Sequence, residues 1–302
     1  MHNKYLRKAA QYAIILSGNK YNTIFGLLKL KGACTPMIII GEKINGSIPS
    51  MAKAIAERNE EWIKDIAKKQ ADAGADYIDC CASVEEGEVE TLHWMIDLIQ
   101  SVTDTPIAVD SPNAAVCIEG MKFCKRPGMI NSVSGEGNKM DVVFPVIADT
   151  KWDVMALLCD DTGIPKTAED RIRVLDNIMA KAKEYGIKES RIHIDPLIEM
   201  LCTSEDGIAM VREVMRYIKE HYPKAHISGA ISNISFNLPY RKIVNIAFAC
   251  LAIDAGMDSA VMDPLSRDLR GAIYAAEALI GEDYMCMEYI GAFREDIFGP
   301  QK

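Results

Sequence analysis

The 302-residue sequence lacks several features that would assign a protein to a broad class at once. It has no apolar run long enough to span a bilayer, and its longest apolar runs have the length of single strands. Its nine cysteines include no Cys-x-x-Cys pair, and an odd number of cysteines cannot form a complete set of disulfides. Most of them lie inside apolar runs, which is typical of buried, reduced thiols. We therefore expect a cytoplasmic protein without a membrane span.

Basic residues are fewer than acidic ones: the sequence has 34 Lys and Arg and 43 Asp and Glu, which gives a formal net charge of -9. Nucleic-acid binding needs a basic surface, so this balance argues against a nucleic-acid enzyme. The exception is the segment 1–36, which carries six basic residues and no acidic one. This change in composition predicts a basic extension over residues 1–36, outside the core, and one domain over residues 37–302.

From Met37 onward, eight short apolar segments alternate with longer segments of helical periodicity. The short segments begin at Met37, Tyr77, Pro106, Met129, Val154, Arg191, His226 and Ser259. The predicted helices cover residues 51–73, 89–102, 114–125, 168–185, 204–221, 241–255 and 268–280, with a less periodic connection over 138–150. Near-continuous apolar strands belong in a parallel sheet that is covered on both faces. Eight such repeats over roughly 260 residues predict an α/β fold of the (β/α)₈ TIM barrel type.

An open, doubly wound sheet is the alternative architecture. Such a sheet normally has a Gly-x-Gly-x-x-Gly turn after its first strand, where a phosphate binds. Here the first turn reads GEKINGSIPS, starting at Gly41. The barrel is therefore favoured.

Carboxylates, amides and a hydroxyl stand at the predicted carboxyl ends of the strands, where the active site of such a barrel lies. They are Glu42, Asn45, Asp79, Asp110, Asn113, Asn131, Asp160, Asp195, Ser232, Asn233 and Asp263. Ionised carboxylates only accept hydrogen bonds, whereas amides both donate and accept them. The group therefore suits a ligand rich in N–H donors, such as the 2-aminopyrimidinone edge of a pterin.

Two other interpretations of these polar residues stay open at this point. Carboxylate and amide oxygens also bind Mg²⁺ or Ca²⁺, although here they come from different strands without a histidine among them. Asp and Asn also commonly cap turns and strand ends. For His193, which shares a strand face with Asp195, an interior structural role is favoured over a catalytic one. The pair Cys80 and Cys81 could bind zinc, but no partner motif follows it.

Six motifs lie in order along these strand ends. They are IIIGEKING (38–46), VDSPN (109–113), MINSVS (129–134), TGIPK (162–166), IDPL (194–197) and SNISFN (232–237). With them the chain resembles the methyltetrahydrofolate:corrinoid protein methyltransferases, which are related to the folate module of cobalamin-dependent methionine synthase. The resemblance covers the sequence from Met37 to about Phe298.

This resemblance implies methyl transfer between N5 of 5-methyltetrahydrofolate and the cobalt of a corrinoid that a separate protein carries. In the family, the residues that correspond to Asp110, Asn131 and Asp195 hold the pterin ring. The residue that corresponds to Asn233 lies near N5, so Asn233 is the expected catalytic residue, which assists N5 by hydrogen bonding or protonation. The further folate-binding residues that we expect are Ser232 and Arg241, with Glu42, Asp79, Asn113, Gly229, Phe236, Val261 and Asp263 around them.

The resemblance also implies tetrahydrofolate and 5-methyltetrahydrofolate as substrates, a corrinoid protein as partner, a homodimer, and no bound metal. Three positions depart from the family pattern. Cys81 stands where relatives often have Asn, Ala230 stands where they tend to have Gly, and Phe236 stands where some have Gln. These departures affect individual contacts and leave the expected site in place.

Two alternative functions remain. One is a dihydropteroate synthase-type enzyme, but the Asn-x-Thr-Pro-Asp-Ser-Phe loop and basic seventh strand expected of it are missing. The other is a non-catalytic folate-binding partner of a corrinoid protein. An assay for pteroate formation distinguishes the synthase from a methyltransferase. An assay for turnover distinguishes the non-catalytic binding partner from a methyltransferase.

Overall fold

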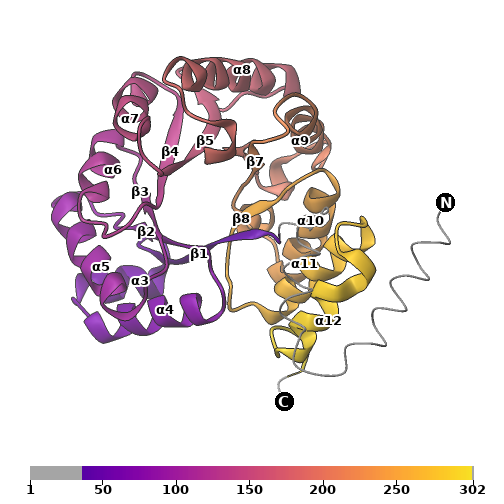
Figure 1. Ribbon diagram of the computed structural model, residues 1–302, viewed down its shortest axis with the longest axis horizontal. Coiled ribbons are helices and arrows are strands. Elements are labelled where there is room, and N and C mark those ends of the chain that lie inside the picture. The colour runs from indigo at the N-terminus through magenta and orange to yellow at the C-terminus, as the bar shows by residue number, and fades with distance from the viewer. Residues whose placement is uncertain (1–35, 301–302) are drawn as a thin grey trace, which may run out of the picture.

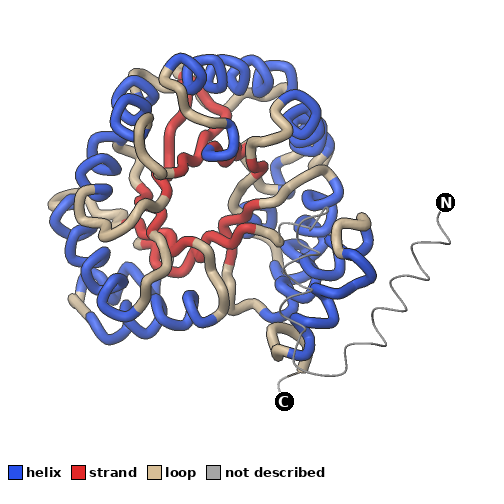
Figure 2. The backbone as a smooth tube through the Cα atoms, in the orientation of Figure 1, coloured by secondary structure: helices blue, strands red, loops and turns tan. Residues whose placement is uncertain are grey.

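The computed structural model describes residues 36–300, in which eight strands form a ring with helices around it (Figure 1). The tube in Figure 2 shows the strands as an inner wall inside the helices. The strands are β1 (Ile38–Asn45), β2 (Tyr77–Cys81), β3 (Ile107–Asp110), β4 (Met129–Gly135), β5 (Asp153–Asp160), β6 (Ile192–Asp195), β7 (His226–Ile227) and β8 (Ser259–Met262). All eight predicted strands are confirmed, within one or two residues at their starts.

Every neighbouring pair of strands in the sheet is parallel, in the order β7-β6-β5-β4-β3-β2-β1-β8. Backbone hydrogen bonds then join the two ends of this order. Asp258 N donates to Ile227 O at 3.2 Å, and Val261 N donates to Gly229 O at 3.0 Å. The nearly closed ring confirms the TIM barrel and leaves little unpaired strand edge.

Helices cover the outer face of the ring. They are α3 (Pro49–Ala56), α4 (Glu60–Asp72), α5 (Glu88–Val102), α6 (Ala114–Met121), α7 (Lys139–Ile147), α8 (Ala168–Glu184), α9 (Ala209–His221), α10 (Arg241–Asp254), α11 (Arg267–Leu279) and α12 (Met287–Arg294). Their apolar sides and the outer faces of the strands form one core of buried side chains, which includes Ile63, Ile99, Phe144 and Ile178. Burial of both strand faces explains the near-continuous apolar strand sequences.

Three predicted helices were wrong in extent, and one of them, predicted over 114–125, ends at Met121. The helix predicted over 51–73 is divided into α3 and α4, because Arg58 adopts a φ of 51° and the side chain of Asn59 caps α4. The helix predicted over 204–221 begins only at Ala209, since the preceding turn has Gly207 with a φ of 66°. Helix α12 was not predicted.

The interior of the ring is filled by side chains below the strand ends. Apolar residues Ile40, Ala108, Met129 and Met155 form one cluster there. His193 is 1% exposed, and its Nδ1 lies 2.9 Å from Oγ of Ser259. Burial lowers the pKa of His193 to about 3, so its ring is neutral at physiological pH. The structure confirms His193 as an interior residue with a satisfied hydrogen bond.

Within residues 36–300, no helix is both long and apolar enough to cross a membrane. The cysteines of this range are all free thiols. The predicted basic extension lies outside the described residues, apart from Pro36.

We predict that the barrel folds without this extension. The backbone N–H of Met37 donates to Oε1 of Glu277 at 2.9 Å, and the Met37 side chain is buried, so the first strand is anchored at its start. A chain that begins at Met37 should therefore unfold at no lower a temperature than the full chain, as measured by circular dichroism.

The matched control is Glu277→Gln in both chains. Burial raises the pKa of Glu277 to about 7, and only in the shortened chain does a charged amino terminus face it. The substitution should therefore cost more stability in the shortened chain. A lower unfolding temperature for the shortened chain itself would show that the extension belongs to the core.

Candidate active site

Side chains from four neighbouring strands form a row at the carboxyl end of the barrel. Asn45 of β1 pairs in register with Cys81 of β2, Cys81 pairs with Asp110 of β3, and Asp110 pairs with Asn131 of β4. In-register partners of parallel strands lie at one level of the sheet. We call these four residues the strand-end row, and it lies where barrel enzymes have their active sites.

Asp79 lies under the strand-end row and connects two of its members. Its side chain is 2% exposed and accepts hydrogen bonds from Nδ2 of Asn131 at 3.0 Å and Nδ2 of Asn45 at 3.5 Å. Nδ2 of Asn45 also lies 3.4 Å from Oδ2 of Asp110. Because Asn131 uses its amide nitrogen on Asp79, its carbonyl oxygen is left to accept a hydrogen bond from a ligand.

Burial raises the pKa of both carboxyl groups, Asp79 and Asp110. Desolvation and then the neighbouring Asp110 raise the pKa of Asp79 well above its ordinary value. Desolvation raises the pKa of Asp110 to about 6, while a hydrogen bond from Cys81 opposes the rise. Two carboxyl groups that share one donor do not ionise independently. Burial therefore disfavours the charged form of both groups, and Asp110, with a pKa of about 6, is ionised at neutral pH.

Asp195, at the end of β6, is the third carboxyl group of the mouth. Its Oδ1 accepts a hydrogen bond from Leu197 N at 2.7 Å, and desolvation raises its pKa to about 6. Gly229 packs closely against it, since a Cβ there would lie 2.5 Å from Cδ1 of Ile198 and 3.3 Å from Oδ1 of Asp195. A side chain at position 229 would have to displace the end of the Ile198 side chain and would be strained at the φ of 153° that Gly229 adopts.

A buried arginine holds the loop that follows Asp195. Arg171 of α8 is fully buried, and its guanidinium donates to the carbonyl of Leu197 at 2.6 Å and pairs with Glu199. Arg171 was not among the residues predicted from the sequence. The only signal for it was a single arginine on the apolar side of a predicted amphipathic helix.

A short 3-10 helix, η3 (Ile231–Ser235), brings Ser232 and Asn233 to the mouth. Oγ of Ser232 donates to Oε2 of Glu42 at 3.1 Å, and Nη2 of Arg241 donates to the backbone carbonyl of Ser232 at 2.7 Å. These contacts fix the turn from both sides. The side-chain amide of Asn233 is exposed and makes no hydrogen bond within the part of the chain that the structure describes.

Other predicted residues lie around this group. Nζ of Lys43 pairs with Oδ2 of Asp263 at 2.9 Å, which neutralises a carboxylate at the rim. The guanidinium of Arg241 lies over the exposed ring of Phe236, 5.5 Å from its centroid. Val261 packs against the interior apolar cluster. These side chains shape the edge of the mouth.

Two of the strand-end residues cap local structure instead. Asn113 is exposed, and its Oδ1 accepts a hydrogen bond from Ala115 N at 3.0 Å at the start of α6. Oδ1 of Asp160 accepts hydrogen bonds from the hydroxyl and the backbone N–H of Thr162, and these bonds lower the pKa of Asp160. The structure does not bring either side chain into contact with the strand-end row.

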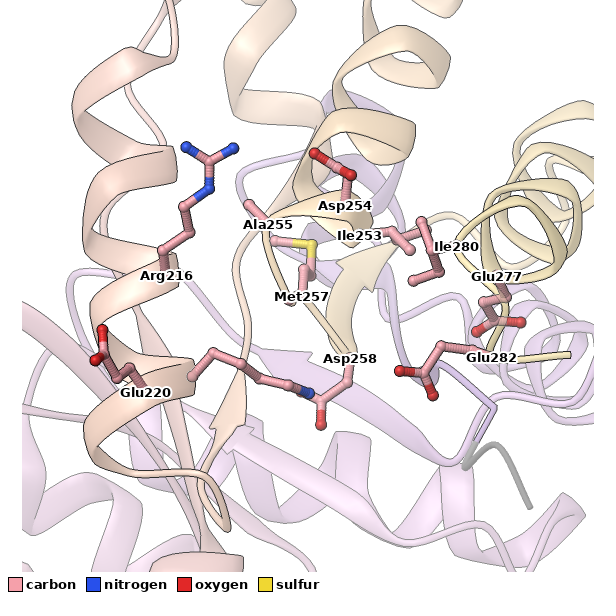
Figure 3. Close-up of a pocket in the computed structure, with 12 residues that line it drawn as sticks. Arg216, Glu220, Ile253, Asp254, Ala255, Met257, Asp258, Glu277, Ile280 and Glu282 are labelled. Atoms are coloured by element: carbon pink, nitrogen blue, oxygen red, sulfur yellow. The ribbon is translucent and has the colours of Figure 1, made fainter. Parts of the chain in front are cut away.

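Among residues 36–300, no three or more His, Cys, Asp and Glu side chains are grouped so that they could hold a metal ion. A cleft of about 370 Å³ lies at the other end of the barrel, between helix ends and the start of β8 (Figure 3). Its lining includes Arg216, Asp258 and Glu277, and none of the predicted site residues. The strand-end group therefore stays the candidate site.

We predict that replacing the ionised carboxylate of the row stabilises the protein. The pKa of Asp110 is raised from an ordinary value of 3.8 to about 6 in the folded protein. Ionised Asp110 therefore destabilises the folded protein at pH values above about 6. Asp110→Asn should raise the free energy of unfolding at neutral pH by about 1–3 kcal/mol. The gain should shrink as the pH falls from about 6 towards 4, where both states are protonated. Chemical denaturation across this range measures it.

Asp160→Asn is the matched control, because Asp160 also ends a strand but has a lowered pKa. This variant should show no gain at neutral pH. A destabilised Asp110→Asn variant would mean that the carboxylate is stabilised in place by its donors and that burial does not dominate.

Comparison with known proteins agrees with this geometry. The family model described as "Pterin binding enzyme" matches residues 45–263. A methylcorrinoid:tetrahydrofolate methyltransferase of Eubacterium limosum is 47% identical over 267 residues, covering 87% of this chain and 98% of that protein.

Solved structures agree on the fold. Dihydropteroate synthase from Xanthomonas albilineans, in complex with 7,8-dihydropteroate, matches with a TM-score of 0.62 and 18% identity, over 82% of this chain and 95% of that chain. The Yersinia pestis dihydropteroate synthase matches with a TM-score of 0.59 and 17% identity, over 82% and 94%. The chain is an enzyme of the pterin-binding family and belongs, within it, to the methyltetrahydrofolate:corrinoid methyltransferases.

Proposed function

We propose that this enzyme transfers a methyl group between N5 of 5-methyltetrahydrofolate and the cobalt of a corrinoid carried by a separate protein. One observation carries the proposal: the mouth of the barrel presents several hydrogen-bond acceptors together with one side-chain amide that has no hydrogen-bond partner among the described residues. Asp110, Asn131 and Asp195 present acceptors there, and the side-chain amide of Asn233 makes no hydrogen bond within residues 36–300. The name of the 47% identical relative supports the same pair of reactants.

The pterin ring would lie across the mouth with its polar edge towards the strand ends. The ionised carboxylates of Asp110 and Asp195 suit the N–H donors of a 2-aminopyrimidinone edge, and the carbonyl oxygen of Asn131 adds another acceptor. Burial is the largest cause of the raised pKa of both carboxyl groups, the Glu88 carboxylate adds to the rise at Asp110, and the strand-end row contains no cation. Donors from a bound ring would stabilise their charged forms, which favours binding.

Asn233 would act on N5. A tetrahydrofolate nitrogen is a poor leaving group unless it gains a proton or a strong hydrogen bond as its bond to the methyl group breaks. A side-chain amide can donate to the N5 lone pair, or rotate and accept once N5 carries a proton. It does so without placing a charge in the mouth. Ser232, held by Glu42 and Arg241, fixes the turn from which Asn233 projects.

The carboxylates would also orient the substrate, so that the N5 methyl group points out of the barrel. A fixed orientation of two reactants lowers the barrier of a transfer reaction by avoiding the loss of their freedom in the reacting complex. The cobalt atom is a substrate group that arrives on the partner protein, and it attacks the methyl carbon from the solvent side. Transfer in the opposite direction uses the same geometry.

The test of the reaction is direct. The protein is mixed with 5-methyltetrahydrofolate and Co(I) cobalamin, and the spectrum of methylcobalamin is followed. Methyl transfer that depends on the enzyme supports the proposal. Pteroate formation from a pterin pyrophosphate would instead indicate a dihydropteroate synthase, and folate binding without turnover would indicate a binding protein.

We predict that Asn233→Ala slows the transfer step at saturating methyltetrahydrofolate by about 10²–10⁴-fold. The lost hydrogen bond strengthens as charge develops on N5, so the effect falls on the rate more than on binding. Single-turnover stopped-flow spectroscopy measures the rate, and thermal unfolding of the same sample measures stability.

Asn138→Ala is the matched control, since Asn138 is another exposed amide near the carboxyl ends of the strands and its side chain caps no helix. It should keep the full rate. A stable Asn233→Ala variant with an unaltered rate would assign the assistance of N5 to water or to another group.

A further inference from the structure

One thiol stands inside the strand-end row, among polar side chains. Cys81 ends β2, is 6% exposed, and lies in register between Asn45 and Asp110. It shares its strand face with Asp79, whereas Cys80 faces the opposite way and belongs to the apolar core under the helices. The two adjacent cysteines therefore have different surroundings.

The number of protons on each group decides which partner donates in the contacts of Cys81. Its Sγ lies 3.1 Å from Oγ of Ser83, and Asp110 is its in-register neighbour on β3, close enough for the thiol to act on the pKa of that carboxyl group. A thiol has one proton, and an ionised carboxylate can only accept, so the S–H donates to Asp110. The hydroxyl of Ser83 then donates to the sulfur. Desolvation and the nearby Asp110 charge raise the pKa of the Cys81 thiol, which keeps it a donor throughout the physiological range.

Few groups in the row favour a charge on Asp110. The carboxylate of Glu88 opposes its ionisation, and Asn45 is a shared donor at 3.4 Å that also serves Asp79. Cys81 is the donor that lowers the pKa of Asp110. The titratable groups that act on Asp110, or on which it acts, are Asp79, Cys80, Cys81, Glu88 and Cys117.

We propose that Cys81 is a positioning residue of this enzyme, whose thiol holds the Asp110 carboxylate as the acceptor that receives the pterin ring. The proposal rests on the proposed folate-binding role of Asp110. Cys81 itself acts through Asp110: it holds the carboxylate from the β2 side, while Nδ2 of Asn45 lies 3.4 Å from Oδ2 of Asp110 on the β1 side.

The experiment measures tetrahydrofolate affinity against pH by isothermal titration calorimetry, with the full chain and with single-residue variants of it. Cys81→Ala removes the donor, so affinity at neutral pH should fall by about 3–10-fold. Because Asp110 then protonates at a higher pH, the loss of affinity on acidification should also begin at a higher pH. Cys81→Ser keeps a donor and should restore both the affinity and the pH profile.

Cys80→Ala is the matched control on the other face of the same strand. It removes a buried apolar side chain, so the unfolding temperature should fall while the pH profile of binding stays in place. Should Cys81→Ala fail to fold, Cys81→Val fills the same space without a donor and should give the same shift.

The proposal is overturned if a folded variant without the donor binds tetrahydrofolate with the affinity and the pH profile of the parent chain. Asp110→Asn separates this failure from a failure of the proposed function. If Asp110→Asn loses affinity and Cys81→Ala does not, only the role of Cys81 is wrong. If neither loses affinity, Asp110 does not bind the ring at all.

Discussion

The register between parallel strands decides which side chains meet at the mouth of this barrel. Asn45, Cys81, Asp110 and Asn131 share one level because they pair in register across three successive strand pairs, which in β1 requires a register shift between Gly41 and Ile44. A slip of one residue on any of these strands would turn its polar side chain to the outer, apolar face. Asp79, one level below, then accepts from the amides on both sides. The apolar strand sequences that fix the register therefore also assemble the site.

The buried carboxylates of the mouth lower the stability of the free protein, and a bound ligand with N–H donors can offset this loss. Asp110 and Asp195 are buried with their pKa values raised to about 6, so each is held in a charged form that the empty site stabilises poorly. The fold remains stable because other contacts hold the backbone around these carboxylates. Fully buried Arg171, for example, holds the loop after Asp195. Sites that hold reactive or binding groups commonly lower the stability of the free protein in this way.

The sequence predicted the eight strands and the barrel, because strands buried on both faces leave a plain apolar signal. It also predicted which residues end the strands, but not what each of them does there. Asn113 and Asp110 look alike as polar residues after β3, yet Asn113 caps α6 while Asp110 belongs to the row. That difference depends on the turn of the chain over two or three residues. The support by Arg171 and the split at Arg58 depend equally on tertiary contacts and on local backbone conformation. Residues 1–36, the homodimer and the cytoplasmic location stay predictions.

The most direct test is a crystal structure with tetrahydrofolate bound. Our account predicts that the pyrimidinone edge contacts Asp110, Asn131 and Asp195, and that N5 lies within hydrogen-bonding distance of the Asn233 amide. The ring would then lie at the carboxyl end of the barrel, with N5 facing solvent. A folate bound in the cleft near Arg216, or in the mouth with N5 far from Asn233, would contradict the account.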